Sequence, residues 1–269
     1  MTQSNIKGTA LVTGASTGIG AVYADRLAHR GYDLILVARD EAKLRDLAVR
    51  LCDHTGVSVS VQKADLGTGA GRAAVEQRLR EDQSITMLVN NAGIAAGGTT
   101  IETDPDLAES VIALNVVAAS RLAISAARAF KGRDHGTIVN IASVLALAPE
   151  RFNGVYDATK AFLLSLSQAM QTELAATGVW VQAVLPGATR TEIWGKMGAD
   201  IDSVPASMLM GVDEMVDAAL KGLDLGELVT IPSLPEIADW KAFETARLAL
   251  GPNLSRQHAA ARYHERPAP

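Results

Sequence analysis

The fold is decided by the stretch Thr9-Ala-Leu-Val-Thr-Gly-Ala-Ser-Thr-Gly-Ile-Gly20. Its first five residues, Thr9 to Thr13, form a short apolar run that leads into a glycine turn, which predicts a buried strand. A helix is expected from about Gly20 to Arg30, and the apolar run from Asp33 to Ala38 predicts a second buried strand. A strand, a glycine turn, a helix and a strand in so compact a unit predict a right-handed βαβ crossover with parallel strands.

The rest of the chain continues this alternation. Further strands are expected over residues 57–62, 86–89, 137–142, 179–185 and 228–231. Helices are expected over residues 41–54, 71–82, 106–130, 154–177, 212–223 and 235–250. Strands that alternate with helices throughout predict one doubly wound α/β domain over residues 1–269. Ligands of such domains bind outside the carboxyl ends of the strands, at the point where the strand order reverses.

The composition is typical of a soluble globular protein. Of the 269 residues, 48% are apolar and 20% are charged, and the formal net charge is −5. The acidic balance predicts no nucleic-acid partner, and the five histidines show no metal-ligand spacing. The single cysteine, Cys52, fits a reducing, cytoplasmic location. No signal peptide is recognisable and no apolar run approaches the roughly 20 residues that span a bilayer, so no membrane partner is expected.

A second stretch, from Ser143 to Lys160, carries candidate chemistry. Tyr156 and Lys160 are four residues apart on a predicted helix, so they share one face. The ammonium is expected to lower the pKa of the phenol from about 10, which would make it a better proton donor at a carbonyl. Ser143, at the end of a neighbouring strand, is placed to hold the carbonyl oxygen. The alternative is an exposed helix on which a tyrosine and a lysine meet by chance.

The glycine turn predicts a nucleotide site. Gly14, Gly18 and Gly20 leave space for backbone N–H groups to approach a pyrophosphate at the positive end of a helix. Their spacing is G-x-x-x-G-x-G instead of the commoner G-x-G-x-x-G, and tight turning alone is the alternative explanation. Their position after the first strand of a βαβ unit favours dinucleotide binding.

The end of the second strand indicates which dinucleotide. NAD-binding proteins usually carry an acidic residue there, whereas this chain has Arg39, whose guanidinium suits a 2′-phosphate. NADP(H) is therefore favoured over NAD(H), although Arg39 could also be an ordinary solvated arginine. Ser16 and Thr17 are candidates for further contacts to the same phosphate. Asp65, after the third strand, is expected to bind the adenine amino group or, alternatively, to cap a helix.

Two further features lie near the expected cofactor. Asn91-Ala92-Gly93 follows the fourth strand and predicts a close-packed turn that shapes the floor of the site. Asn115 lies inside the otherwise apolar helical segment from Val111 to Val117. Because a buried amide needs hydrogen-bond partners, Asn115 predicts a kink in the helix or a bound water.

Taken together, these residues resemble the short-chain dehydrogenase/reductase family. The resemblance covers roughly residues 8 to 191, and several motifs keep the order and spacing of the family. These motifs are Thr13-Gly14-x-x-x-Gly18-Ile19-Gly20, Asn90-Asn91-Ala92-Gly93, Asn115, Ser143, Tyr156-x-x-x-Lys160, and Pro186-Gly187 with Thr191. The resemblance implies a Rossmann-type sheet of seven parallel strands with helices on both faces.

The resemblance also implies a mechanism. Tyr156 would be the general acid when a carbonyl is reduced and the general base when an alcohol is oxidised. Lys160 would lower the pKa of the phenol and bind the nicotinamide ribose, Ser143 would orient the substrate oxygen, and Asn115 would hold a water of a proton relay. The cofactor-binding residues would be Gly14, Ser16, Thr17, Gly18, Ile19, Gly20, Arg39, Asp65, Leu66, Asn91, Ala92, Gly93, Tyr156, Lys160, Pro186, Gly187, Thr189 and Thr191.

Departures from the family are few. Asp157 and Thr159 stand where the family often has other small residues, and both are expected to face away from the chemistry. No basic residue precedes Gly18, where some NADP-dependent members have one. By family analogy, the helices that begin near Asp104 and Gly154 would form the interfaces of a homodimer or homotetramer.

The segment after the sixth strand is expected to cover the substrate. Residues 188–211 are apolar and irregular, which predicts a mobile lid, with a plain surface loop as the alternative. Residues 252–269 are expected to be a solvated tail. The sequence therefore predicts an NADP(H)-dependent oxidoreductase that acts on a carbonyl or alcohol of an apolar small molecule. The alternative is a nicotinamide-binding regulatory or scaffold protein without turnover.

Overall fold

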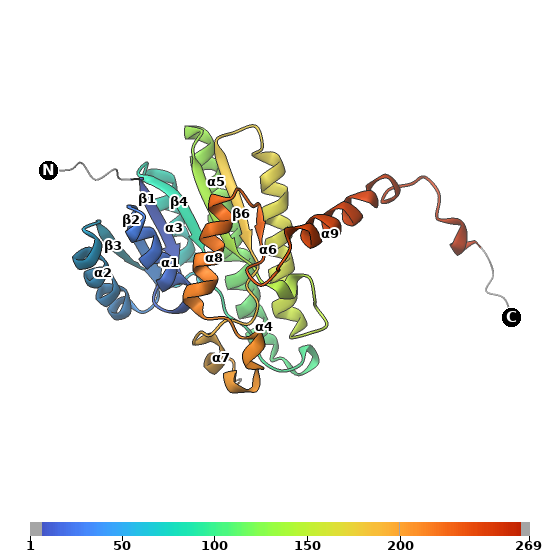
Figure 1. Cartoon of the computed structure of the whole chain (residues 1–269), viewed down its shortest axis with the longest axis horizontal. Coiled ribbons are helices and arrows are strands. Elements are labelled where there is room, and N and C mark those ends of the chain that lie inside the picture. The colour runs from blue at the N-terminus through green and yellow to red at the C-terminus, as the bar shows by residue number, and fades with distance from the viewer. Residues whose placement is uncertain (1–6, 199, 265–269) are drawn as a thin grey trace. The chain divides into compact units, whose positions relative to one another are not determined.

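The computed structural model describes residues 7–198 and 200–264, and it falls into two compact units. The first unit runs to Pro232 and contains all the motifs described above. A second, smaller unit begins at Ser233. Figure 1 shows the elements of both units. The prediction of one domain over the whole chain stays a prediction.

The first unit is built on a seven-stranded sheet in the order β3-β2-β1-β4-β5-β6-β7, in which every pair of neighbouring strands is parallel. The predicted seven-stranded, doubly wound fold is confirmed. The strands are β1 (Thr9–Thr13), β2 (Asp33–Ala38), β3 (Val59–Lys63), β4 (Ile85–Asn90), β5 (Gly136–Ile141), β6 (Val179–Val184) and β7 (Val229–Thr230). The order reverses between β1 and β4, so the carboxyl ends of these two strands mark the expected ligand crevice.

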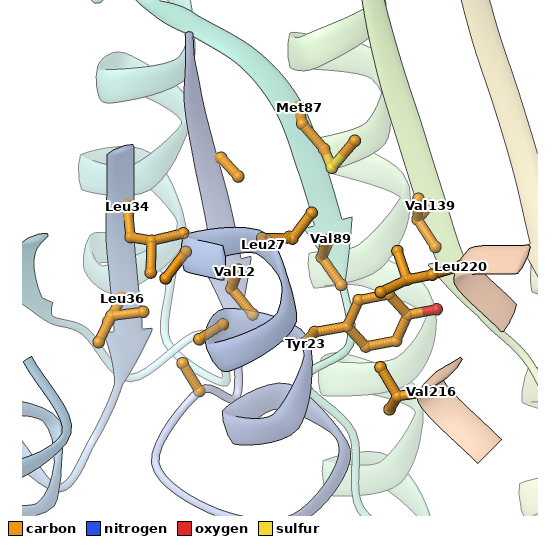
Figure 2. Close-up of a cluster of buried hydrophobic side chains, with 14 of the residues drawn as sticks. Val12, Tyr23, Leu27, Leu34, Leu36, Met87, Val89, Val139, Val216 and Leu220 are labelled. Carbon is orange, nitrogen blue, oxygen red and sulfur yellow. The ribbon is translucent and has the colours of Figure 1, made fainter. Parts of the chain in front are cut away.

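Helices cover both faces of this sheet. They are α1 (Gly18–His29), α2 (Glu41–Thr55), α3 (Gly69–Glu81), α4 (Pro105–Ile112), α5 (Ala119–Arg133), α6 (Gly154–Glu173), α7 (Ile193–Lys196) and α8 (Val212–Asp224). One buried cluster joins the sheet to α1, α2 and α8, and Figure 2 shows Tyr23 of α1 packed there beside Val216 and Leu220 of α8. A second cluster joins the opposite face of the sheet to α3, α5 and α6. The burial of apolar side chains in both clusters stabilises the three layers.

Local sequence explains where several helices begin. Asp40 accepts a hydrogen bond from the Lys43 N–H at 3.1 Å, and Asp104 accepts one from the Asp106 N–H at 2.7 Å. Pro105 occupies the first turn of α4, where its missing N–H is tolerated. Asn153 caps α6 by accepting hydrogen bonds from the N–H groups of residues 155 and 156. These caps fix the starts of α2, α4 and α6.

The helix expected over residues 106–130 is interrupted. Between α4 and α5, residues Ala113–Ala118 form a π-helical turn, and Asn115 lies inside it. The whole helical stretch Pro105–Arg133 is long and apolar enough to cross a membrane by length and composition, but 39% of its most apolar window is buried inside the protein. Leu122, Ala126 and Phe130 of α5 belong to the core of the α/β unit. We therefore describe it as a helix of the globular unit.

The segment 188–211 is more regular than expected. It contains α7 and two 3₁₀ turns, Ile201–Ser203 and Ala206–Met208. The ends of the segment are joined, because the Arg190 N–H donates to the Met210 carbonyl and the Met210 N–H donates to the Ala188 carbonyl, both at 2.9 Å. The Trp194 indole N–H donates to the Thr189 carbonyl at 2.8 Å. The segment is therefore an Ω-like loop that folds on its own base.

The second unit is helical. Its main element is α9 (Ile237–Ala249), which contains no buried residue. Trp240 and Phe243 of α9 pack with their ring centroids 5.4 Å apart. Two 3₁₀ turns follow, Gly251–Asn253 and Ala261–Tyr263. The predicted solvated tail over residues 252–269 lies partly here, and its last five residues lie outside the described part of the chain.

Candidate active site

Three side chains predicted to act together do meet at the end of β5. Ser143 follows that strand and is buried, and its hydroxyl lies close enough to the Tyr156 phenol to lower the pKa of that phenol. The same hydroxyl accepts from the Leu145 N–H at 3.2 Å, which fixes its position. Lys160 lies one turn further along α6, with Nζ 5.5 Å from the centre of the Tyr156 ring. The structure thus places a hydroxyl, a phenol and an amine within one small volume.

Lys160 is held by the sheet. Its side chain is buried, and Nζ donates a hydrogen bond to the Ile141 carbonyl at the end of β5, at 2.9 Å. Burial disfavours the charged ammonium and lowers the pKa of Lys160 to about 8. The amine is therefore fixed in place and close to titrating at physiological pH.

The expected effect of Lys160 on Tyr156 is wrong for this structure. Burial raises the pKa of Tyr156 above its usual value, the carboxylate of Asp157 raises it further, and the hydrogen bond with Ser143 lowers it. The Lys160 amine lies over the aromatic ring and bonds to a carbonyl, so it does not meet the phenol oxygen directly. Phe152 packs edge-on against the ring, with centroids 5.7 Å apart, and adds to the burial. The phenol is consequently protonated at neutral pH.

Asn115 joins two sides of the site through the π-turn. Its Oδ1 accepts from the Ile94 N–H at 3.0 Å, and its Nδ2 donates to the Ile94 carbonyl at 2.8 Å and to the Thr159 hydroxyl at 3.1 Å. The predicted kink is confirmed as a π-helical turn. A Cβ on Gly93 would lie 3.1 Å from Asn115 Oδ1 and 3.7 Å from Lys160 Nζ, so this glycine lets Asn115 and Lys160 approach the same point.

The two departures from the family do not face away, so that expectation is wrong. Thr159 is buried, donates to the Tyr156 carbonyl at 2.7 Å and accepts from Asn115. Asp157 is only 1% exposed, and neither of its carboxylate oxygens has a hydrogen-bond partner among the described residues. Burial raises the pKa of Asp157 to about 6, with a smaller contribution from the charge of Glu150. Both residues belong to the surroundings of Tyr156.

The glycine turn has the form of a phosphate cradle. Gly14 and Gly18 have positive φ values of 66° and 56°, and a Cβ on Gly20 would collide with the Gly14 carbonyl oxygen. The first turn of α1 has no side-chain cap and no acidic residue, so its backbone N–H groups and its positive end stay free for an anion. A pyrophosphate would fit here. Ser16 and Thr17 are half-buried in this turn, and Ile19 packs against the core.

Asn91 and Ala92 shape the floor of the crevice. The Thr13 hydroxyl accepts hydrogen bonds from the N–H groups of Asn91 at 2.9 Å and Ala92 at 3.0 Å. The Asn91 amide also donates to the Thr13 carbonyl at 2.8 Å. These bonds tie the turn after β4 to the end of β1. They hold the turn in place at the floor of the crevice.

One buried polar chain was missed by reasoning from the sequence. Asn90 Nδ2 donates to Asn140 Oδ1 at 3.1 Å, Asn140 donates to the Ser167 hydroxyl at 2.9 Å, and Ser167 donates to the Leu163 carbonyl at 2.7 Å. It links β4, β5 and α6 directly behind the site. An asparagine in each of two apolar strands was a visible signal, but their pairing depends on the adjacency of β4 and β5.

The adenosine side of the crevice is open. Arg39 is exposed and forms no ion pair within the part of the chain that the structure describes, so its guanidinium is available to a phosphate. Asp65 is exposed too, and its Oδ1 accepts a hydrogen bond from the Gly67 N–H at 2.9 Å, which makes it the cap of a turn. Leu66 is buried in the core. Only Arg39 and Asp65 of these predicted residues present free polar atoms.

The opposite wall is made by the segment after β6. The Val144 N–H donates to the Pro186 carbonyl at 3.0 Å, and the buried Thr189 hydroxyl donates to the Gly187 carbonyl at 3.0 Å. Thr191 lies over the glycine turn, since a Cβ on Gly18 would be 3.5 Å from it. The segment therefore connects the surroundings of Ser143 to the glycine turn.

The segment 188–211 lies against a second loop. A Cβ on Gly97 would lie 2.6 Å from the Met197 carbonyl oxygen, so only glycine permits this approach. Asn153 anchors the same loop, because its Nδ2 donates to the Gly98 carbonyl at 3.2 Å and to the Thr103 hydroxyl at 2.7 Å. Asn153 thus caps α6 and holds the loop that the segment 188–211 contacts.

Comparisons with known proteins agree with this geometry. The family model for short chain dehydrogenase matches residues 8–202. The chain is 51% identical to a short-chain dehydrogenase from Sphingobium yanoikuyae, solved in complex with NADPH, with a TM-score of 0.92 over 95% of this chain and 99% of that one. It is 45% identical to a bulky-bulky ketone specific alcohol dehydrogenase from Comamonas testosteroni, with a TM-score of 0.88 over 95% and 98% of the two chains. A 7β-hydroxysteroid dehydrogenase from Collinsella aerofaciens is 27% identical over 87% of this chain and 90% of its own length.

Proposed function

Since the chain belongs to the short-chain dehydrogenase/reductase family, we propose that it interconverts bulky, apolar ketones and their secondary alcohols, with Tyr156 as the proton-transferring residue. It is an oxidoreductase that uses NADP(H) and acts on CH–OH and C=O groups. The observation that carries the proposal is the meeting of Ser143, Tyr156 and Lys160 beside Gly93 in the crevice.

Bound NADPH would supply a hydride to the carbonyl carbon, and the protein would supply the proton and the placement. Ser143 orients the carbonyl oxygen with its hydroxyl, and the Tyr156 phenol gives that oxygen its proton, so that the ketone becomes a neutral alcohol. Lys160 stabilises the phenolate left behind, and Asn115 and Thr159 hold the backbone around it. In the oxidative direction the phenolate accepts the hydroxyl proton of the alcohol.

The nucleotide side is assigned in the same way. The free N–H groups at the start of α1 would bind the pyrophosphate, and Arg39 would bind the 2′-phosphate. Asp65 offers one carboxylate oxygen to the adenine amino group. Thr189 and Thr191 lie between the cradle and Ser143, where the carboxamide end of the cofactor would reach.

The substrate class rests on the lid and on one relative. Trp194 and Met208 lie on the lid segment and Leu147 lies just after Ser143, and Met208 and Leu147 expose apolar surface. These side chains suit a substrate with large apolar groups on both sides of the carbonyl. The Comamonas enzyme, whose name states a preference for such ketones, supports this assignment by its 45% identity.

Self-association is part of the proposal. Large apolar side chains stay exposed along the outer faces of two helical stretches of the α/β unit, namely Leu107, Ile112, Val117 and Ile124 on Pro105–Arg133 and Phe162 on α6. A second copy of the chain would cover this stripe in a homodimer or homotetramer. The substitution Ile124→Glu is expected to reduce the molar mass measured by light scattering, and an unchanged mass would contradict this interface. A cytoplasmic location is also proposed, and cell fractionation tests it.

The central test is the substitution Tyr156→Phe. Initial rates of NADPH oxidation are measured with ketones that carry two bulky groups and with small ketones. The variant is expected to lose roughly 10²- to 10⁴-fold in kcat/KM while NADPH affinity is unchanged. Tyr32→Phe serves as the control, because Tyr32 is half-buried and lies at the amino-terminal end of β2, away from the crevice. Tight NADPH binding without turnover of any carbonyl or alcohol would instead favour the regulatory or scaffold protein.

A further inference from the structure

Asp157 is a buried carboxylate that has no hydrogen-bond partner among the described residues. It follows Tyr156 on α6, is 1% exposed, and neither oxygen finds a hydrogen-bond partner in residues 7–198 and 200–264. Buried carboxylates normally accept hydrogen bonds or pair with a cation, because desolvation of an unpaired charge is costly. The mechanism described above gives this group no function, so its presence next to the reacting phenol needs an explanation.

Among the described residues, no cation is paired with Asp157. On its own helix, Lys160 is already bonded to the Ile141 carbonyl. On the preceding loop, Glu150 repels Asp157, and Arg151 lies 4.0 Å from Glu150. The elements packed against α6 are β5, β6, the 3₁₀ turn Val144–Ala146, the π-turn, α4 and α5, and the first four carry no charged side chain. The loop over residues 98–104 is also hydrogen-bonded to the start of α6, and its acids, Glu102 and Asp104, are exposed.

The remaining two segments, α4 and α5, provide no cation that pairs with Asp157 among the described residues. The acids of α4, Asp106 and Glu109, are exposed. On α5, Arg121 pairs with Glu76 and Arg133 donates to the Ile85 carbonyl. Arg128 and Lys131 of α5 are exposed. The group on which the Asp157 charge acts is the Tyr156 phenol, whose pKa it raises.

The position on the helix favours the ionised form. Asp157 lies in the first turn of α6, where the positive end of the helix stabilises a negative charge. Its pKa, raised by burial to about 6, still leaves it ionised above that pH. A negative charge fixed beside a phenol opposes the loss of the phenolic proton, since two like charges would then lie close together.

We propose that Asp157 is a positioning residue that acts through Tyr156: its buried carboxylate sets the pH range of proton transfer by keeping the phenol protonated to a higher pH. This inference rests on the proposed function, in which Tyr156 exchanges the proton. Asp157, which is not one of the Tyr-Lys pair, would therefore determine the pH at which the rate changes.

The test is Asp157→Asn, which keeps the shape and removes the charge. The pH at which alcohol oxidation reaches half its maximal kcat/KM is expected to fall by roughly one unit, and so is the pH at which ketone reduction declines. In the NADP⁺ complex, ultraviolet titration of tyrosinate should show roughly tenfold more ionised Tyr156 at any pH below the midpoint. Titration of the Tyr156→Phe variant identifies which part of the signal belongs to this residue.

The melting temperature tests whether the Asp157 carboxylate is charged in the folded protein. The folded pKa of Asp157 lies above its ordinary value of 3.8, so its burial destabilises the protein above about pH 6 and not below about pH 4. Asp157→Asn is therefore expected to melt at a higher temperature than the wild type at pH 7, with a smaller difference near pH 4.

Controls separate the possible failures. Glu150→Gln makes the same change of charge at an exposed position and is expected to shift the profile much less. Profiles and titrations of Asp157→Asn that superimpose on those of the wild type would overturn the inference, because asparagine would then be mimicking an acid that is already protonated. If Asp157→Asn does not fold, Asp157→Ser is measured in the same way. Full activity of Tyr156→Phe would reject the proposed function. The titration would still show whether the charge of Asp157 changes the ionisation of Tyr156.

Discussion

The two halves of the crevice are built on opposite principles. In the nucleotide half, from Thr13 to Gly20 with the turn at Asn91, the site is made of backbone, and hydrogen bonds between Thr13, Asn91 and Ala92 hold it in shape. In the catalytic half, ionisable side chains are buried or half-buried and have shifted pKa values: the pKa of Lys160 is lowered, while those of Tyr156 and Asp157 are raised. The nucleotide half contributes to stability, whereas the catalytic half holds groups that the folded protein would be more stable without.

This difference teaches which substitutions each half tolerates. A site made of backbone fails when atoms are added, because the ligand and the neighbouring chain occupy the space that glycine leaves. A site made of buried charges fails when a charge is removed, although the protein can gain stability from the same change. Activity and stability should therefore move together when a glycine of the nucleotide half is replaced, and in opposite directions when a buried ionisable group of the catalytic half is replaced.

The largest effect on cofactor binding is expected for Gly20→Ala. The new Cβ would collide with the Gly14 carbonyl oxygen and press on the Asn91 amide, so the turn must shift. NADPH affinity, measured by fluorescence titration, is expected to fall roughly 10³-fold, or about 4 kcal/mol. The free energy of unfolding should fall by about 1–3 kcal/mol. Gly69→Ala is the matched control, because its Cβ would meet nothing within 4 Å, and wild-type affinity in Gly20→Ala would refute a backbone cradle.

Lys160→Met should separate activity from stability. The loss of the amine beside the phenol is expected to reduce kcat/KM roughly 10²- to 10³-fold. The folded pKa of about 8 lies below the ordinary 10.5, so the unfolded chain binds more protons between these values. The cost of burial is therefore full below pH 8 and disappears as the pH rises to 10.5.

The corresponding measurement is chemical unfolding across this pH range. Lys160→Met is expected to be more stable than the wild type at pH 7 by on the order of 2 kcal/mol, and the difference should shrink by pH 10. Lys221→Met, at an exposed position of α8, should show neither effect. A variant that is less stable at pH 7 would mean that the hydrogen bond to Ile141 outweighs the cost of desolvation.

Arg39→Gln tests the outer end of the nucleotide half, where a side chain and not the backbone is expected to bind. The loss of a charge-assisted contact to the 2′-phosphate should weaken NADPH binding roughly 10- to 100-fold and leave NADH binding unchanged. Because Arg39 is exposed, stability should not change. Arg50→Gln, also exposed, on α2, is the control, and equal losses for NADPH and NADH would rule out recognition of the phosphate.

The smallest effect is expected for Thr159→Val. The substitution removes the acceptor for the Asn115 amide and leaves one buried N–H without its partner, which costs about 1 kcal/mol of stability. A loss of about fivefold in kcat/KM corresponds to the same free energy. Thr172→Val is the control, because Thr172 makes a similar bond to its own helix at an exposed position. Equal effects of the two variants would place Thr159 outside the catalytic half.

Much of the architecture could be predicted, because its signals are local. Apolar runs marked the strands, and Asp40 and Asp104 marked the starts of helices. Asn115 indicated the break in its helix, since an amide in an apolar stretch must disturb it or be satisfied there. Asn153 before Gly154 was an equally clear capping signal that could have been used.

The errors concern burial. Asp157 was expected to face away because helical spacing says which side a residue takes, but not whether another segment covers that side. The pKa of Tyr156 was expected to fall because Lys160 shares its face, yet the amine bonds to Ile141 and desolvation dominates. Both outcomes depend on how β5, α4 and the loop before α6 pack around one helix.

The sequence by itself determined the strands, the glycine turn and the identity of the groups that meet at the crevice, because each of these depends on the neighbours within a few residues. The tertiary structure alone decided which of those groups lost water and which found a partner. Solvation and pairing are properties of the space between elements that are distant in the chain, and for this reason the acidity of Tyr156, Lys160 and Asp157 became visible only in three dimensions.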